Sequence, residues 1–450
     1  MIPPPDIQSH ELARKVLRLA VPIMLASLSQ TLMSLIDIAM VGRLGAAAVA
    51  AVGLGGMLTY AFSSFLNAIQ AGVQTVVARR VGEGRHSEAV AALRSTLYFA
   101  LLTGSVFAGL YIWAARQLLP IINADQEVVV LSTAYVQLRG ISLGPVMAGY
   151  VFYAFYNGIS QPRIHLVVSV LANTLNVVLN YGLIFGRLGF PEMGAPGAGL
   201  ATTLSTTTAF VLYALLTRTA RIRHQYPGIW TWPHEMKTLI RILKLSLPIS
   251  VQNFGVMIGF AVFMVLMGWV STVALAATEI IINILSFSFM PAMGFLYATQ
   301  TLVSENIGQG RHHLAEGATR VATLLCLILM GAMGILFILF PRPILHIFTP
   351  DEAIVTAGVL PLQILGLVQF FDAVGMVHHG ALVGAGDNTF QAIGEMIIMW
   401  LLFLPATYVT SILMDWGITG GWVALAFYIV AYATMAYLRF RYGPWKRIVV

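Results

Sequence analysis

The chain has 450 residues, of which 58% are apolar and 10% are charged, and its formal net charge is +7. Soluble domains carry about 25% charged residues, so this composition excludes a soluble enzyme, a disordered protein and a nucleic-acid-binding domain. The mean hydropathy of +0.83 indicates an integral membrane protein. The single cysteine, Cys326, excludes a disulfide framework and a cysteine-rich metal site.

Twelve apolar stretches are long enough to cross a hydrocarbon core of about 30 Å as helices. They are apolar on every side and lack the alternation of barrel strands, so we predict an all-α integral membrane fold with 12 transmembrane helices. The predicted spans are 17–41, 46–78, 93–115, 128–157, 165–187, 196–218, 243–270, 272–303, 319–341, 355–384, 391–414 and 418–438.

The basic residues are distributed unevenly between the two sides of the membrane. With the N-terminus inside, 20 of the 25 Lys and Arg residues fall in cytoplasmic segments and four in outer segments, while Arg139 lies within a span. This bias predicts a multi-pass protein of the cell membrane, inner or plasma, with cytoplasmic N- and C-termini. Asp37 in the first span and the lack of a small-residue cleavage site argue against a removable signal peptide.

The two halves of the chain match each other at a constant offset along the sequence. The matching segments are 19–22 with 245–248, 48–51 with 274–277, 82–86 with 308–312, and Gly158 with Gly384, and near the end, where the offset slips slightly, 194–201 matches 417–424. Each half holds six spans, an even number, so both halves insert the same way up. We therefore predict two parallel six-helix repeats, in a 6+6 arrangement.

This repeat predicts the division of the chain into domains. We expect an N-lobe over 1–218, a cytoplasmic connection over 219–242 that contains Trp232 and Pro233, and a C-lobe over 243–450. Parallel repeats of this kind are typical of transporters, whose solute site lies between the halves near the middle of the membrane. The pattern favours a transporter over an enzyme.

Four polar residues of the N-lobe are expected at one depth, in its outer half. Asp37 lies near the outer end of the first span, and Asn176 and Asn180 share one face of the fifth span. Thr202 follows early on the sixth span, which begins outside. An intramembrane carboxylate with amide and hydroxyl oxygens suits either a Na⁺ site or a hydrogen-bond network around a protonatable acid.

The C-lobe also carries acids within its spans. Asp372 and Glu279 are candidates to hold a cation or a proton together, whereas Glu395 lies near the cytoplasmic start of its span and is interpreted as structural. Arg139 is interpreted as a structural charge partner. Pro22, within the first span, removes one backbone hydrogen bond and is the candidate hinge.

Several kinds of chemistry have no motif in the chain. It contains no GxxxxGK[ST], HExxH or CxxC, so ATP does not drive it directly and we expect no bound cofactor, only H⁺ or Na⁺ as a coupling ion. The adjacent His378 and His379 diverge on a helix, which argues against a shared metal. The expected partners are membrane lipids and small organic molecules, cationic or amphipathic, with no nucleic acid and a monomeric chain.

At this point the sequence resembles the MATE family of multidrug and toxic compound extrusion transporters, nearest its NorM-type branch. The resemblance covers the whole chain. It is carried by Pro22 with 37–45 (DIAMVGRLG), by 176–181 (NVVLNY) with 185–186 and 194–202, and by 369–372 (QFFD) with 380–387.

The resemblance implies two six-helix bundles around a central cavity and export of organic, often cationic, compounds against an inward H⁺ or Na⁺ gradient. Asp37 stands at the coupling aspartate of the family's N-lobe, and Asp372 at the acid of its C-lobe. The chain departs from the pattern at Asn180, where some relatives have Asp, at Val256, where NorM-type members have Glu, and at Glu279, where Gln is usual.

Two alternatives remain open from the sequence. A lipid-linked oligosaccharide or peptidoglycan-precursor flippase of the same superfamily would need a basic cavity for a pyrophosphate, whereas this chain has one intramembrane Arg and several acids. A membrane-embedded prenyl transferase would need Asp-rich Mg²⁺ motifs, which the chain lacks. The residues favour a cation-coupled exporter.

Overall fold

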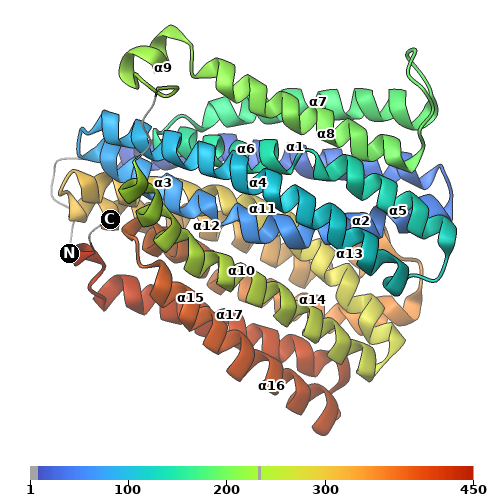
Figure 1. The fold of residues 1–450 in the computed structure, drawn as a ribbon. Helices are drawn as coiled ribbons and strands as arrows, with labels where there is room; N and C mark the ends of the chain where they lie inside the picture. The colour runs from blue at the N-terminus through green and yellow to red at the C-terminus, as the bar shows by residue number, and fades with distance from the viewer. Residues whose placement is uncertain (1–8, 232–234, 449) are drawn as a thin grey trace. The chain divides into compact units, whose positions relative to one another are not determined.

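The computed structural model describes residues 9–231, 235–448 and 450, and within them it is built from helices, without strands (Figure 1). Packing divides the chain into two compact units. We call Leu25–Ser246 the N-unit. We call the start of α1 (Ser9–Gly42) up to Met24, together with Leu247–Val450, the C-unit.

The N-unit holds the second part of α1 and the first part of α10. Between them it contains α2 (Ala46–Asn67), α3 (Ile69–Gly82), α4 (His86–Ile122), α5 (Gln126–Gly140), α6 (Leu143–Gly158), α7 (Pro162–Phe185), α8 (Ala195–Leu216) and α9 (Ala220–Gln225). The α7 helix begins with Pro162 in its first turn and ends at Gly186, whose φ of 65° suits glycine.

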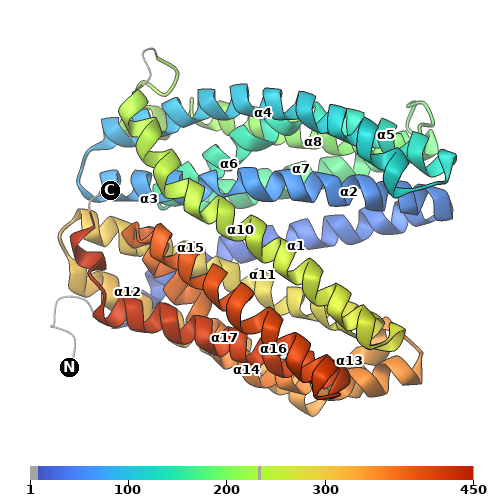
Figure 2. The same cartoon turned by 60° about the horizontal axis from the view of Figure 1, so that its bottom comes forward.

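The C-unit holds the rest of α10 and the helices that follow it (Figure 2). The helix α10 spans Met236–Val270. The helices that follow it are α11 (Thr272–Gly308), α12 (His312–Leu339), α13 (Pro341–Phe348), α14 (Glu352–Ala385), α15 (Asn388–Ile397), α16 (Leu404–Tyr408) and α17 (Gly417–Tyr442). The π-helical segments η1 (Ile398–Phe403) and η2 (Val409–Leu413) join α15 and α16 into one apolar helix over Asn388–Leu413, and the 3-10 turn η3 (Trp445–Arg447) follows α17.

Ten helices in the described chain are long and apolar enough to cross a membrane, and they correspond to ten of the twelve predicted spans. The prediction of unbroken helices is wrong for the second and fourth spans. The span predicted over 46–78 forms α2 and α3, which are separated at Ala68, and the span over 128–157 forms α5 and α6. The layout of two sets of six spans is retained. In the first set, the second span consists of α2 and α3, and the fourth span consists of α5 and α6.

The break between α5 and α6 lies just before a proline. Pro145 has no amide hydrogen to donate to the preceding turn, and it lies in the first turn of α6, where that donor is not needed; a proline alone does not impose a break, since Pro22 and Pro248 lie inside continuous helices. Ser142 compensates for the interruption, because both its amide and its hydroxyl donate to the carbonyl oxygen of Arg139, at 3.2 and 2.8 Å. Backbone groups inside a membrane need such partners.

The sequence repeat reappears in the geometry of both units. Gly84 and Gly310 occupy equivalent positions in the two repeats and have φ values of 74° and 70°, and α4 and α12 each begin shortly after them. The close contacts match as well. A Cβ on Gly158 would meet Gln74 on α3, and a Cβ on Gly384 would collide with the backbone of Gln300 on α11.

The helices α1 and α10 are each divided between the two units, so the units are not continuous along the chain. The start of α1, up to Met24, packs in the C-unit, and α10 up to Ser246 packs in the N-unit. Pro22 and Pro248 lie close to these two boundaries. The division into lobes at 218 and 243 stays a prediction of the sequence, and Trp232 and Pro233 of the connection lie outside the described residues.

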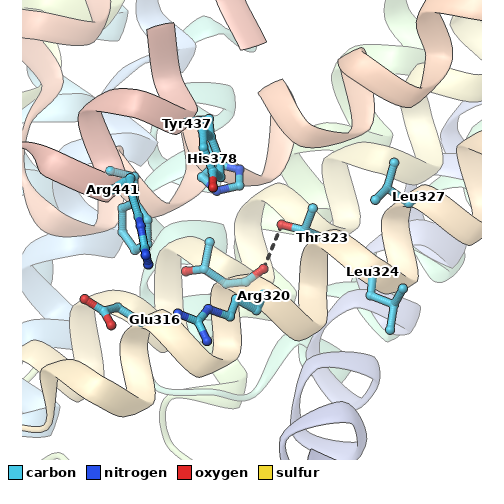
Figure 3. A pocket seen from close by; sticks show the side chains of 10 residues that line it. Glu316, Arg320, Thr323, Leu324, Leu327, His378, Tyr437 and Arg441 are labelled. Atoms are coloured by element: carbon cyan, nitrogen blue, oxygen red, sulfur yellow. Dashed lines mark hydrogen bonds between the residues drawn. The ribbon is translucent and has the colours of Figure 1, made fainter. Parts of the chain in front are cut away.

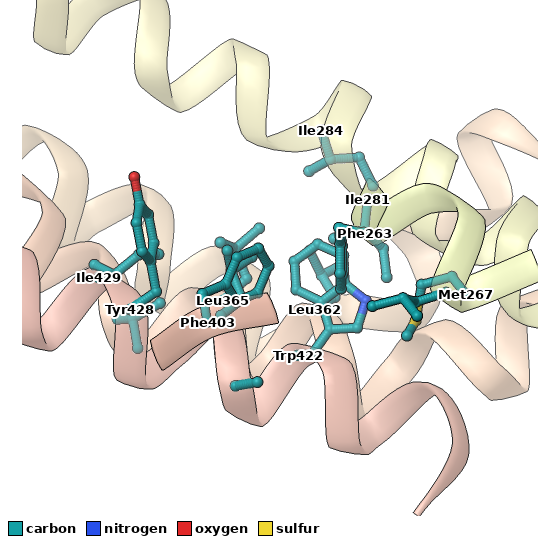
Figure 4. Packing of buried hydrophobic residues seen from close by; sticks show 14 of the residues in the cluster. Phe263, Met267, Ile281, Ile284, Leu362, Leu365, Phe403, Trp422, Tyr428 and Ile429 are labelled. Carbon is teal, nitrogen blue, oxygen red and sulfur yellow. The ribbon is translucent and has the colours of Figure 1, made fainter. Parts of the chain in front are cut away.

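Aromatic side chains fill the core of the C-unit (Figure 4). Phe263, Phe403 and Trp422 are at most 1% exposed and come from α10, η1 and α17. The ring centroids of Phe263 and Phe403 are 5.1 Å apart, which is within the range of favourable ring packing. This core packs α10, α14 and α17 against the helix over Asn388–Leu413, which carries Glu395.

The contact between α11 and α14 leads to a stability prediction. Gly384→Ala places a methyl group against the Gln300 carbonyl, and we expect it to cost about 1–3 kcal/mol of stability through overpacking. Gly53→Ala is the matched control, because a Cβ at this position in α2 meets nothing within 4 Å. Thermal unfolding in detergent should show a lowered midpoint for the first variant only, and equal midpoints would contradict the packing.

Candidate functional site

In the N-unit, α1 and α7 meet at a carboxylate. The Asn180 amide nitrogen donates to Asp37 Oδ1 at 2.5 Å and to Asn176 Oδ1 at 3.0 Å. Asp37 is half-buried, whereas Asn176 and Asn180 are fully buried. The side-chain amide of Asn180 therefore links Asp37 on α1 to Asn176, one turn earlier on α7.

The network continues onto α8. The Asn176 amide nitrogen lies 3.3 Å from both Thr202 Oγ1 and Ser205 Oγ, and donates to them. Thr202 in turn donates to the carbonyl of Ala198 at 2.9 Å. The structure thus brings together the four residues that the sequence places at one depth.

The ends of the helices explain this common depth. Asp37 lies five residues before the end of α1 and Asn180 five residues before the end of α7, while Thr202 lies seven residues after the start of α8. With a rise of about 1.5 Å per residue, all three are about 8–10 Å from the same side of the unit.

Two groups of this site keep acceptor capacity. Asn180 Oδ1 is buried and has no hydrogen-bond partner in the part of the chain that is described, and the Asp37 carboxylate has further lone pairs. The positive charge of Arg139 on α5 also acts on Asp37. A carboxylate beside a free amide oxygen is able to accept a proton or to ligate a small cation.

Sequence reasoning missed other polar contacts of these helices, one of them within the network. Ser205 accepts from Asn176 and donates to the carbonyl of Thr202 at 3.0 Å, and Asn173 donates to Ser29 on α1 at 2.9 Å. The signal was available for Asn173, because it precedes Asn176 by three residues and so shares its helix face. Ser205 had no such signal, since serine is common in membrane helices as a local hydrogen-bonding residue.

In the C-unit, Glu395 on α15 accepts a hydrogen bond at each of its carboxylate oxygens. Tyr428 of α17 donates its hydroxyl to Glu395 Oε1 at 2.7 Å, and Gln252 of α10 donates its amide to Glu395 Oε2. A further buried cluster lies on neighbouring turns, where Gln391 donates to Tyr432 at 2.5 Å and His379 also contacts the Tyr432 hydroxyl. The donors to Glu395 agree with the structural interpretation of this residue made from the sequence, although the sequence did not identify which residues they are.

Asp372 on α14 differs from Glu395 in its partners. It is half-buried and makes no hydrogen bond through its side chain with any residue that the structure describes, and the charge of Glu395 acts on it. The charge of Asp372 also acts on Cys326 of α12. The C-unit therefore holds one carboxylate with donors around it and a second one that is free to accept.

The structure does not bring Glu279 to Asp372. The helices α11 and α14 run in the same direction, with Ser288 bonded to Gln369 and Gly380 packed on Leu296. Asp372 therefore lies beside residue 290 or 291 of α11, about 16 Å along the axis from Glu279. Glu279 is exposed, and only its backbone carbonyl accepts a hydrogen bond, from Asn283, among the described residues. The pairing predicted from sequence has no geometric support.

The fold and these sites define a class of protein. Two parallel six-span repeats, each with a half-buried carboxylate inside its spans, form the architecture of a membrane transporter. The MatE family model matches residues 22–182 and again 248–409, so that each repeat carries its own copy of the match. The chain belongs to the MatE family, which confirms the resemblance found in the sequence.

Relatives of known name match nearly the whole chain. A probable multidrug resistance protein NorM from Thermotoga maritima is 30% identical over 99% of this chain and 96% of its own length. The multidrug resistance protein PmpM of Pseudomonas aeruginosa is 29% identical over 95% of this chain and 90% of its own length.

Solved structures share the fold. An outward-facing multidrug resistance MATE family transporter of the MOP superfamily gives a TM-score of 0.88 at 21% identity, covering 96% of this chain and 95% of that one. A MOP superfamily transporter from Pyrococcus furiosus gives 0.87 at 21% identity with the same coverage. The twelve-helix, 6+6 arrangement predicted from sequence is confirmed by this agreement.

The contrast between two glutamates gives a second prediction. Glu395→Gln replaces an oxygen that accepts from Tyr428 or Gln252 with an NH₂ group that faces a donor, so we expect a loss of about 1–3 kcal/mol. Glu279→Gln is the same chemical change on an exposed side chain and should stay within about 0.5 kcal/mol. The measurement compares the unfolding midpoints of the two variants with that of the wild type in detergent. A Glu395→Gln protein as stable as the wild type would refute this description of the site.

Proposed function

We propose that this protein is a secondary active multidrug exporter, which exchanges organic compounds, cationic or amphipathic, for inward-moving H⁺ or Na⁺. The observation that carries the proposal is the half-buried Asp37 carboxylate, which lies beside Asn180 Oδ1, an oxygen without a hydrogen-bond partner among the described residues. The names of the relatives, which describe multidrug resistance proteins, support the same function. Proteoliposomes with an imposed pH or Na⁺ gradient test it directly.

In this proposal the N-unit carries the main coupling site. H⁺ or Na⁺ binds at Asp37 with the oxygens of Asn176, Asn180 and Thr202 nearby, and neutralises the carboxylate. Moving one charge through 100 mV supplies about 2.3 kcal/mol, which is roughly a fifty-fold concentration ratio for the exported compound. One or two ions per cycle are enough for useful export.

The C-unit contributes a second acidic site in this scheme. Asp372 is its ion-accepting group, because its carboxylate makes no hydrogen bond with the described residues, and Glu395 adds a second negative charge close by. The exposed position of Glu279, about 16 Å along the helix axis from Asp372, argues against the pairing expected from sequence. Acids in both units and a single intramembrane Arg favour cationic compounds over a pyrophosphate-linked lipid.

Alternating access supplies the transport cycle in this scheme. The bound ion must favour one conformation of the protein, because a ligand of equal affinity for both conformations shifts neither. Pro22 is the proposed hinge. It lies inside the continuous helix α1, two residues before the point where α1 passes from the C-unit to the N-unit. A proline removes a backbone hydrogen bond and so lowers the cost of bending at that point.

The protein lies in the inner or plasma membrane as a monomer in this proposal. Both of its termini are in the cytoplasm. Arg223→Cys places a thiol on α9 in the connection, and Glu192→Cys places one in the outer segment between α7 and α8; both positions are exposed. An impermeant thiol reagent added to intact cells should label only the second variant. The native Cys326 is buried and does not interfere. Labelling of Arg223→Cys from outside would reverse the topology.

Asp37→Asn tests coupling at the N-unit site. The amide keeps the shape of the side chain but cannot exchange a proton or carry charge, so we expect gradient-driven efflux of a fluorescent organic cation to be lost. Asp125→Asn is the matched control, because Asp125 caps α5 from an exposed position and asparagine caps a helix equally well. Both variants are compared at matched membrane expression.

A companion variant separates coupling from folding. Asn180→Asp adds a second carboxylate beside Asp37, and we expect it to change the Na⁺ or pH dependence of efflux while transport continues. Wild-type efflux from the Asp37→Asn protein would eliminate the proposed mechanism.

A further inference from the structure

A cavity of about 370 Å³ lies in the C-unit between α12, α14 and α17, and its lining includes neither Asp372 nor Glu395 (Figure 3). Its lining changes along α12 from charged to apolar. Glu316, Arg320 and Arg441 line one end, and Leu324 and Leu327 line the other. The charged end lies toward the start of α12 and the end of α17, which is the cytoplasmic side in the proposed orientation.

The charged end has an excess of unpaired positive charge. Lys446 neutralises Glu316 through an ion pair of 2.6 Å. The guanidinium groups of Arg320 and Arg441 make no ion pair or hydrogen bond with the residues that the structure describes, and both side chains are exposed. Arg439, two residues before Arg441, behaves differently because it binds Asp387 at 2.7 Å. Two guanidiniums therefore remain free to bind an anion.

The apolar end extends to the surface of α12. Leu324 is 60% exposed and Ile328, one turn further along, is 63% exposed. In a helix that spans the membrane, these side chains face acyl chains or another apolar group. Basic residues at the membrane surface followed by an apolar helix face match the two parts of an anionic phospholipid.

We infer that this cavity binds the phosphodiester headgroup of an anionic phospholipid of the inner leaflet, with Arg320 and Arg441 on the phosphate and the acyl chains along Leu324 and Ile328. Charge complementarity decides the occupant. An exported cation would be repelled by the two guanidiniums, and a small free anion would leave Leu324 and Leu327 without a partner. Arginine also suits a phosphate because its planar group offers paired donors.

The imidazole of His378 adds a contact for the headgroup. His378 Nδ1 lies 2.8 Å from the carbonyl oxygen of Val374 and donates to it, so that in the neutral ring Nε2 is an acceptor. A headgroup with a free hydroxyl, such as the glycerol of phosphatidylglycerol, is able to donate to that nitrogen. Phosphatidylglycerol is therefore the first probe to use.

The experiment measures lipid binding to the purified full-length protein in detergent by native mass spectrometry. Phosphatidylglycerol is titrated against the wild-type chain and against the double variant Arg320→Gln/Arg441→Gln. Each basic residue near a membrane surface contributes about a factor of five in affinity, so the double variant should bind about thirty-fold more weakly. Phosphatidylcholine, which has no net charge, should bind both proteins equally and weakly.

Two further variants distinguish the cavity from general electrostatics and from misfolding. Arg221→Gln/Arg223→Gln removes the same charge from exposed positions on α9 and should bind phosphatidylglycerol as the wild type does. Glu316→Gln removes an acid and frees Lys446, so it should bind about five-fold more tightly. A gain of affinity of this kind does not arise from a damaged fold.

Three results would overturn the inference. Equal affinity of the wild type and the Arg320→Gln/Arg441→Gln variant would remove the two arginines from binding. An equal loss in the α9 double variant would assign binding to net charge instead of the cavity. Displacement of the lipid by glycerol 3-phosphate at the same concentration would identify a site for a free phosphate anion.

Discussion

The close approach of α14 to α11 is the contact on which the C-unit depends. Gly380 and Gly384 lie directly against the backbone of Leu296 and Gln300, and nothing larger than hydrogen fits there. This contact sets the register of the two helices, pairs Ser288 with Gln369, and thereby determines the depth of Asp372. In the N-unit, Gly158 makes the corresponding contact with Val77 and Gln74 of α3, where a Cβ would first meet the Val77 side chain. Small residues have this role in membranes because apolar side chains gain little by leaving lipid for a helix interface.

Much of the fold follows from patterns that lipid imposes on a sequence. Apolar length predicted ten of the twelve spans as unbroken helices, since each must satisfy its backbone hydrogen bonds internally, and the constant offset between the halves matched 82–86 with 308–312, where α4 and α12 begin. The breaks at Ala68 and before Leu143 were missed because hydropathy measures polarity and carries little information on local backbone geometry. Similarly, chain order alone does not reveal that the start of α1 packs in the C-unit.

The candidate sites were predictable to different degrees. Asp37, Asn180 and Thr202 could be related because each lies near a helix end, where depth is well defined from sequence. Glu395 could not, since its environment consists of Gln252 on α10 and Tyr428 on α17, which belong to other helices on either side of it in the chain. Relating them required the packing of three helices, and spacing along one helix contains no such information.

The exchange of helix segments at α1 and α10 makes the two halves of the chain depend on each other. Each unit is completed by a segment whose helix continues in the other unit: residues up to Met24 in one case, and residues of α10 up to Ser246 in the other. Neither half of the sequence repeat therefore contains all the segments of one unit. A cut between the halves near residue 230 would separate most of the N-unit from the part of α10 that belongs to it, and Leu247–Val450 from the start of α1.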